Sequence, residues 1–177
     1  MDCFRPWRKC QTNEWFTKKP ETDSIGVIIG NKAINVKGKN YTLIALAIRG
    51  GGYEAEWASN FTIGISGQHD GFNTAKNNVL DFLKTYIDEQ GIIGSVKIWI
   101  TGYSRAAATA NLLAGAIDDG ETISTDISYS CDDIYAYCFE TPAGALVDDV
   151  KRKTRYNNIF NIINSSDPIP YLAPATL

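Results

Sequence analysis

The chain has 177 residues, which suits one domain, and 44% of them are hydrophobic and 21% charged, as is usual in soluble globular proteins. The net charge of −3 gives no electrostatic reason to expect nucleic acid as a partner. The first residues form no apolar leader and the longest apolar run, 42–48, is too short to cross a bilayer, so we expect no transmembrane segment and favour a cytoplasmic location.

The amino-terminal part of the chain predicts strands. Residues 1–24 are polar, contain two prolines and predict an irregular lead-in. The β-branched run 25–30 predicts a strand, and 33–36 is expected to pair back on it as a hairpin with its turn at Asn31. The run 42–48 is continuously apolar, which is typical of a strand buried on both faces of a sheet.

The rest of the chain alternates between helices and strands after a glycine-rich turn at 50–52. The expected elements are a helix over 72–89, a strand over 96–100, a helix over 105–117, and strands over 134–139 and 159–163. The first helix repeats apolar residues at helical spacing: Phe72, Ala75, Val79, Phe82, Leu83 and Tyr86. This order predicts an α/β fold with a mainly parallel central sheet and flanking helices, in a single domain over 1–177.

A strand, a tight turn and a helix meet around Ser104. The turn reads Gly-x-Ser-x-Ala, with Gly102 and Ala106 on either side of the serine, and a nucleophile elbow needs small residues at both positions. Ser104 would then stand at the carboxyl ends of the strands, where the positive end of the following helix favours a developing oxyanion. The alternative is that Ser104 only caps that helix.

The four cysteines and the single histidine bear on metal binding. No pair of cysteines has the spacing of zinc ligands, and one histidine adds little to a ligand set. We therefore expect no metal and no cofactor, and thiols that are buried or free.

Four segments, in chain order, resemble the class 3 lipase family of the α/β-hydrolase superfamily. They are 47–51 (AIRGG), 69–72 (HDGF), 101–108 (TGYSRAAA) and 164–171 (NSSDPIPY). The chain departs from the commonest family pattern at Tyr103, where histidine is usual, and at Ala106, where glycine is usual. Neither departure removes a catalytic atom.

The resemblance implies a carboxylic ester hydrolase that acts on acylglycerol-type lipids. Ser104 would be the nucleophile, and Asp167 the acid that orients an imidazole. Gly51 and Arg105 would supply the two backbone N–H groups of the oxyanion hole, while His69 would have a structural role near the site. Two of these roles have a plainer alternative: Asp167 stands in an Asp-Pro pair typical of turns, and the glycines at 50–52 suit any flexible turn.

The histidine that should follow Asp167 in such an enzyme is absent, because His69 is the only histidine and precedes Ser104. Three explanations remain: a chain truncated at its carboxyl end, which we favour, a natural hydrolase-fold module that binds or interacts without catalysis, or a histidine supplied by a partner chain. We expect little turnover from these residues alone. A different acyl-transfer enzyme built on the same elbow is a further alternative, and apolar surface exposed by truncation would favour a homodimer.

Overall fold

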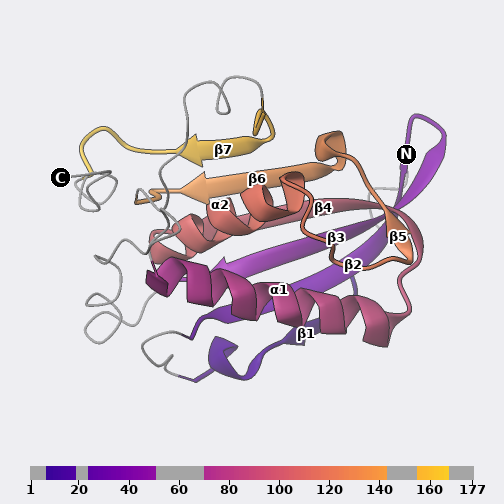
Figure 1. Ribbon diagram of the computed structural model, residues 1–177, viewed down its shortest axis with the longest axis horizontal. Coiled ribbons are helices and arrows are strands. Elements are labelled where there is room, and N and C mark those ends of the chain that lie inside the picture. The colour runs from indigo at the N-terminus through magenta and orange to yellow at the C-terminus, as the bar shows by residue number, and fades with distance from the viewer. Residues whose placement is uncertain (1–6, 19–23, 51–69, 143–154, 168–177) are drawn as a thin grey trace.

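The computed structural model describes residues 7–18, 24–50, 70–142 and 155–167 of the chain. In these ranges a sheet of seven strands carries two α-helices (Figure 1). The elements are, in order, β1 (Arg8–Thr12), the 3-10 turn η1 (Glu14–Phe16), β2 (Gly26–Val36), β3 (Lys39–Arg49), α1 (Asp70–Gln90), β4 (Gly94–Tyr103), α2 (Arg105–Asp118), β5 (Ile127–Ser128), the 3-10 turn η3 (Cys131–Asp133), β6 (Ile134–Phe139) and β7 (Ile159–Ile162).

The sheet is mixed, and its part around the elbow is parallel. The strand order is β1-β2-β3-β4-β6-β7, with β5 beside the start of β4. β1, β2 and β3 pair antiparallel, whereas β3, β4, β6 and β7 pair parallel. The predicted α/β fold with flanking helices is therefore confirmed, and the carboxyl ends of four strands meet at one edge of the sheet (Figure 1).

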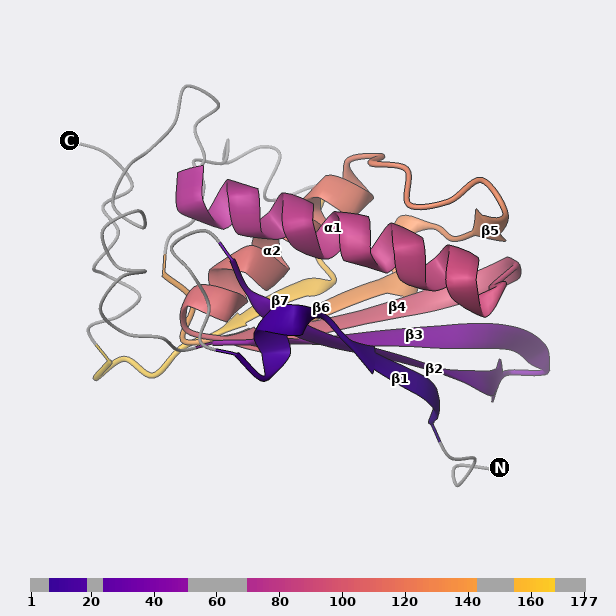
Figure 2. The same cartoon turned by 90° about the horizontal axis from the view of Figure 1, so that it is seen from below.

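Both helices lie on the same face of the sheet (Figure 2). In β4 the buried residues Val96, Ile98 and Ile100 alternate with Lys97 and Trp99, which are partly exposed. Such alternation is typical of a strand that is covered on one face. Most buried residues of the two helices and of the strands form one apolar core, and Phe72, Ala108 and Leu112 form a smaller second cluster between the helices.

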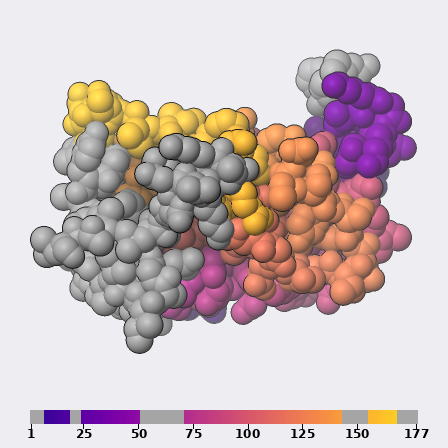
Figure 3. All heavy atoms as spheres, turned by 45° about the horizontal axis from the view of Figure 1, so that its top comes forward, coloured from indigo at the N-terminus to yellow at the C-terminus, as the bar shows by residue number. Residues whose placement is uncertain are grey.

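The opposite face of the sheet carries a row of aromatic side chains. Trp99 meets Tyr137 edge to face with ring centroids 6.5 Å apart, and Tyr137 stacks on Phe160 at 5.1 Å. Trp99 and Phe160 keep 40% and 42% of their surface exposed, so these aromatic side chains are in part open to solvent. Figure 3 shows that the segment around β7 lies at the outside of the molecule.

The predicted hairpin turn at Asn31 is wrong. β2 runs unbroken to Val36 and pairs with β3 along its whole length. The turn is instead Lys37-Gly38, with φ of 51° and 84°, as a two-residue type I′ turn requires. Asn31 stays in the strand and its side chain donates a hydrogen bond of 2.8 Å to the hydroxyl of Tyr86 on α1.

The lead-in that was expected to be irregular holds the strand β1. It pairs with β2 at the edge of the sheet, and most of its residues are exposed. Lys9 has a positive φ of 48° where the register shifts, which is a bulge in the strand. An exposed edge strand with basic residues has no apolar alternation, so its pattern did not predict it.

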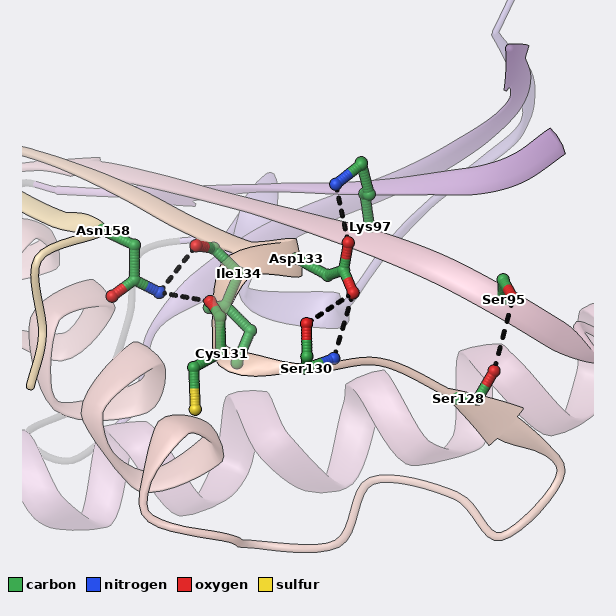
Figure 4. A network of polar contacts seen from close by, with 8 residues as sticks. All are labelled: Ser95, Lys97, Ser128, Ser130, Cys131, Asp133, Ile134 and Asn158. Carbon is green, nitrogen blue, oxygen red and sulfur yellow. Dashed lines mark hydrogen bonds and ion pairs between the residues drawn. The ribbon is translucent and has the colours of Figure 1, made fainter. Parts of the chain in front are cut away.

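A polar network ties together the amino ends of β4, β6 and β7 (Figure 4). Lys97 lies 2.6 Å from Asp133, and Asp133 in turn accepts hydrogen bonds from the backbone and the hydroxyl of Ser130. The amide of Asn158 donates to two carbonyl groups around the start of β6, at 2.9 and 2.7 Å. These residues lie at the opposite end of the strands from Ser104, so the network serves the fold rather than the elbow.

Candidate active site

The sharp turn between β4 and α2 holds Ser104. Its backbone dihedrals are φ 55° and ψ −126°, a conformation that residues with a side chain rarely adopt. Its N–H donates to the carbonyl of Phe139 at 2.9 Å, and its carbonyl accepts from the N–H groups of Ala107 and Ala108 at 2.8 and 3.2 Å. The backbone of Ser104 is therefore held from β6 on one side and from α2 on the other.

The Ser104 hydroxyl is not used as a helix cap. Ser104 occupies the N-cap position of α2, yet its side chain makes no capping hydrogen bond. A capping serine also has extended dihedrals, unlike the positive φ seen here. The helix-capping alternative is therefore not what the structure shows, and strain of this kind is concentrated at functional sites.

Small residues on both sides of Ser104 make the turn sterically feasible. A Cβ atom added to Gly102 would lie 2.4 Å from the carbonyl oxygen of Ala106 and 2.6 Å from its carbonyl carbon. Both atoms belong to the backbone of α2 and do not give way easily. Ala106 itself is fully buried against the sheet, so a larger side chain would have no room there either.

The end of β3 comes close to the same turn. A Cβ atom added to Gly50 would lie 2.6 Å from the carbonyl oxygen of Tyr103. Gly51, the expected oxyanion donor, and His69 lie outside the described residues. Arg105 is the first residue of α2, where a helix directs its backbone N–H out of its amino end. Its side chain is buried and donates to the carbonyl of Ser24 at 3.2 Å. The oxyanion roles of Gly51 and Arg105 remain predictions.

Asp167 and Ser104 both follow the carboxyl ends of parallel strands, so they lie at the same edge of the sheet. It follows β7, which is parallel to β6, and β6 supplies the carbonyl that holds the Ser104 amide. The Asp167 N–H donates to the carbonyl of Asn164, and the Ser166 N–H donates to the Asn164 side chain, each at 3.0 Å. The segment is therefore an ordered turn that places a half-buried carboxyl residue beyond the ends of the strands.

Glu140 is a further charged residue at this edge, and its role was not predicted from the sequence. It follows β6 directly and has a positive φ of 50°. Its carboxylate accepts the Asn164 N–H, with distances of 2.9 and 3.1 Å to its two oxygens. An acidic residue directly after a buried parallel strand was the available signal, since such positions lie where α/β sheets place their sites.

Cys138 pairs with Gly102 across the strands β4 and β6, but its thiol is not a candidate nucleophile. Its thiol is free and buried, and this burial raises its pKa to about 12. Only the thiolate is nucleophilic, so Cys138 is inert at neutral pH. The other described cysteines, Cys10 and Cys131, are free and exposed.

Replacing Ser104 with glycine is expected to stabilise the fold. Glycine adopts a positive φ without steric cost, so we expect the free energy of unfolding to rise by about 1–2 kcal/mol. Ser104→Ala keeps a Cβ atom and the strain, and is expected to stay within about 0.5 kcal/mol of the parent chain. Urea unfolding of the three chains checks this, and equal stabilities of the two variants would contradict the strain at Ser104.

The residues that the structure describes show neither a metal-binding cluster nor a membrane-spanning helix. No group of three or more His, Cys, Asp or Glu side chains gathers there closely enough to hold a metal ion. Neither of the described α-helices is both long and apolar enough to span a bilayer.

Solved lipase structures share the fold of this chain. A fungal lipase–inhibitor complex superimposes with a TM-score of 0.57 at 18% identity, covering 85% of this chain and 57% of that one. A lipase from Rhizopus microsporus var. chinensis gives 0.55 at 14%, covering 95% and 56%, and the Rhizomucor miehei lipase propeptide complex (a Ser95/Ile96 deletion mutant) gives 0.54 at 19%, covering 85% and 47%. The chain thus spans about half the length of these lipases.

Sequence comparison assigns the family more directly than the structural likeness does. No curated protein matches the chain in sequence. The family model described as Lipase (class 3) matches residues 45–177, which is well over half of the chain and includes the elbow and the Asp167 segment. The chain therefore belongs to the class 3 lipase family.

Proposed function

We propose that this chain carries the nucleophile and the acid of a serine hydrolase that cleaves carboxylic esters of lipids. The observation that supports the proposal best is the strained turn at Ser104, held from two elements while its hydroxyl is not used by the helix. Family membership suggests the substrate class, because lipases hydrolyse lipid esters. Asp167 is the proposed acid, since it leaves the same edge of the sheet.

The proposed reaction has two steps. The Ser104 Oγ attacks the carbonyl carbon of the ester, and the oxygen that becomes negative accepts hydrogen bonds from the N–H groups of Gly51 and Arg105. The bond to the alcohol oxygen breaks, and the alcohol leaves with the proton that the serine gave up. Water then attacks the acyl-enzyme, which releases the carboxylic acid and restores Ser104.

A base must take the proton from Ser104, and the sequence provides one histidine, His69, ahead of the nucleophile. The role proposed for Asp167 is to orient an imidazole rather than to act on the serine itself. We therefore expect slow reaction from these 177 residues alone. Free imidazole in solution offers the missing group and gives a direct way to test the arrangement.

Labelling with a fluorophosphonate probe tests the proposed function. We expect slow labelling of the parent chain, accelerated at least about tenfold by added imidazole, because a positioned base contributes about 10²–10⁴-fold. Ser104→Ala should not be labelled, and Asp167→Asn should lose most of the response to imidazole. A folded chain that stays unlabelled with and without imidazole would contradict the proposal.

That contrary outcome would support a second candidate, a hydrolase-fold module that binds or interacts without catalysis. The position of His69 ahead of Ser104 favours this candidate. Binding of a lipid ester without labelling would identify it, while transfer of the acyl group to an added alcohol would identify a different acyl-transfer enzyme. The homodimer stays a prediction, and sedimentation at increasing protein concentration tests it.

A further inference from the structure

We propose that Glu140 is a positioning residue that fixes the acid loop, residues 164–167, against the strand beside the nucleophile. The inference rests on the proposed function, because it assigns Asp167 to the acid. Glu140 acts through hydrogen bonds to the loop rather than by contact with the substrate. It is therefore a positioning residue and not a catalytic one.

The contact between Glu140 and the loop is direct. Both carboxylate oxygens lie within hydrogen-bond distance of the Asn164 N–H, at 2.9 and 3.1 Å. A backbone N–H donated to a carboxylate makes a charge-assisted bond, which is stronger than a bond between neutral groups. Asn164 is the first residue of the acid loop, and its own carbonyl and side chain accept from Asp167 and Ser166. The bond from Glu140 therefore fixes the first residue of the turn that contains Asp167.

The same strand end also holds the nucleophile. Phe139 accepts the Ser104 N–H, and the next residue, Glu140, donates its own N–H to the carbonyl of Ile162 at the end of β7. Residues 139 and 140 thus bind the elbow on one side and the acid segment on the other. A shift of this strand end would move Ser104 and Asp167 relative to each other.

The backbone of Glu140 supports a specific use of its side chain. Its φ of 50° lies in the left-handed region, where glycine is more stable than a residue with a Cβ atom. A side chain in such a conformation persists when the surrounding structure compensates for its cost. The carboxylate bond to Asn164 is the compensation seen here, because glycine would keep the backbone and lose this bond.

Three variants of Glu140 separate the carboxylate from the backbone. Glu140→Gln keeps one acceptor oxygen, Glu140→Ala removes the acceptors and keeps the strain, and Glu140→Gly removes both. We expect the imidazole-supported labelling of Ser104 to fall about tenfold in the alanine and glycine variants alike, and to be largely retained in the glutamine variant. Glu121→Ala is the matched control, since Glu121 is a partly exposed carboxylate that binds Lys84 away from the elbow, and its labelling rate should not change.

A second background tests whether Glu140 acts through the acid. In Asp167→Asn chains the further change of Glu140 to alanine should have no added effect on labelling, because the residue it positions is already lost. If Glu140 only supported the fold, its change to alanine would slow labelling by the same factor in the parent and in the Asp167→Asn chains. Labelling of Glu140→Gly at the parent rate would overturn the proposal, since it would leave the carboxylate without a role.

Amide hydrogen exchange separates failure of this inference from failure of the proposed function. If the parent chain is not labelled even with imidazole, the proposed function is wrong. Amide hydrogen exchange alone then tests whether Glu140 fixes the acid loop. Loss of the carboxylate in Glu140→Gly should speed exchange at Asn164 and Asp167 by about tenfold, with no change at Leu83 in α1. Parent-like exchange at both loop amides in that variant would overturn the positioning role.

Discussion

A Gly102→Ala chain is expected to lose about 3 kcal/mol of unfolding free energy, together with the reactivity proposed for Ser104. The added Cβ atom would lie 2.4 Å from the Ala106 carbonyl oxygen, closer than atoms in proteins approach without a shift. The clash is with the backbone, so relief requires α2 to move away from β4. That movement would also disturb the hydrogen bonds from Ala107 and Ala108 to Ser104. Urea unfolding and probe labelling measure the two effects.

Gly115→Ala is the control for this experiment, because Gly115 lies inside the neighbouring helix α2. The nearest atom to an added Cβ there is in the Tyr156 ring at 4.0 Å, which is ordinary contact. Alanine favours the helix, so we expect a gain of about 0.5–1 kcal/mol and unchanged labelling. A Gly102→Ala chain that is as stable and reactive as the Gly115→Ala chain would contradict the close approach at the elbow.

An Asp133→Ala chain is expected to lose about 2–3 kcal/mol, although the change lies at the other end of the strands from Ser104. Lys97 and Asp133 are 15% and 17% exposed and 2.6 Å apart, so removing the aspartate leaves a largely buried ammonium without its carboxylate. The Ser130 hydrogen bonds to Asp133 are lost as well. Asp132→Ala, an exposed neighbour, should change stability by less than about 0.5 kcal/mol.

The pH dependence of this loss follows from the two pKa shifts. Burial by itself would raise the pKa of Asp133, but hydrogen bonds from Lys97 and Ser130 outweigh it and hold the pKa below the usual 3.8. The contribution of Asp133 is therefore present above pH 4 and is lost as the pH falls through its lowered pKa. Burial opposes the charge of Lys97 too, but Asp133 raises its pKa above 10.5, so its contribution is lost only in stronger alkali.

A double-mutant cycle checks this assignment. The stability difference between the parent and Asp133→Ala chains should be constant from about pH 5 to 9 and shrink below pH 4. Changing Lys97 to methionine should reduce the cost of Asp133→Ala, because no unpaired ammonium then remains. Additive losses in the double variant would show that the pair contributes nothing beyond its separate residues.

The elements with strong periodic patterns were predictable from sequence. Helix 72–89 is confirmed as α1, and the strands predicted over 134–139 and 159–163 are β6 and β7. The apolar residues of α1 and β6 repeat at the spacing that burial requires, whereas the residues of β7 are largely exposed. The order of these elements was enough to predict the parallel part of the sheet.

Other features depend on contacts that no local pattern encodes. The turn at Lys37-Gly38 was missed because Asn31 seemed the better turn residue. In the structure the side chain of Asn31 instead donates a hydrogen bond to the hydroxyl of Tyr86 on α1. The short strand β5 consists of two residues that pair with the start of β4, which is too little for a recognisable pattern.

The candidate site divides in the same way. Ser104 followed from its strand, turn and helix, whereas Asp167 depended on the family resemblance, since an Asp-Pro pair alone suggests a turn. The structure shows that Asp167 does lie in a turn, and a residue in this turn can still have the proposed role of the acid. Glu140 was missed because its importance lies in a bond to a residue 24 positions later.

The parallel pairing around the elbow also has a consequence for the order of folding. β2 and β3 are joined by a two-residue turn and can pair early, whereas β4 pairs with β3 and β6 only after long connections have closed. The amide of Ser104 is held by Phe139 of β6, so its conformation depends on the pairing of β4 with β6. The proposed reactivity of Ser104 would therefore appear during refolding only after β4 and β6 have paired, and later than any signal from the β2–β3 hairpin.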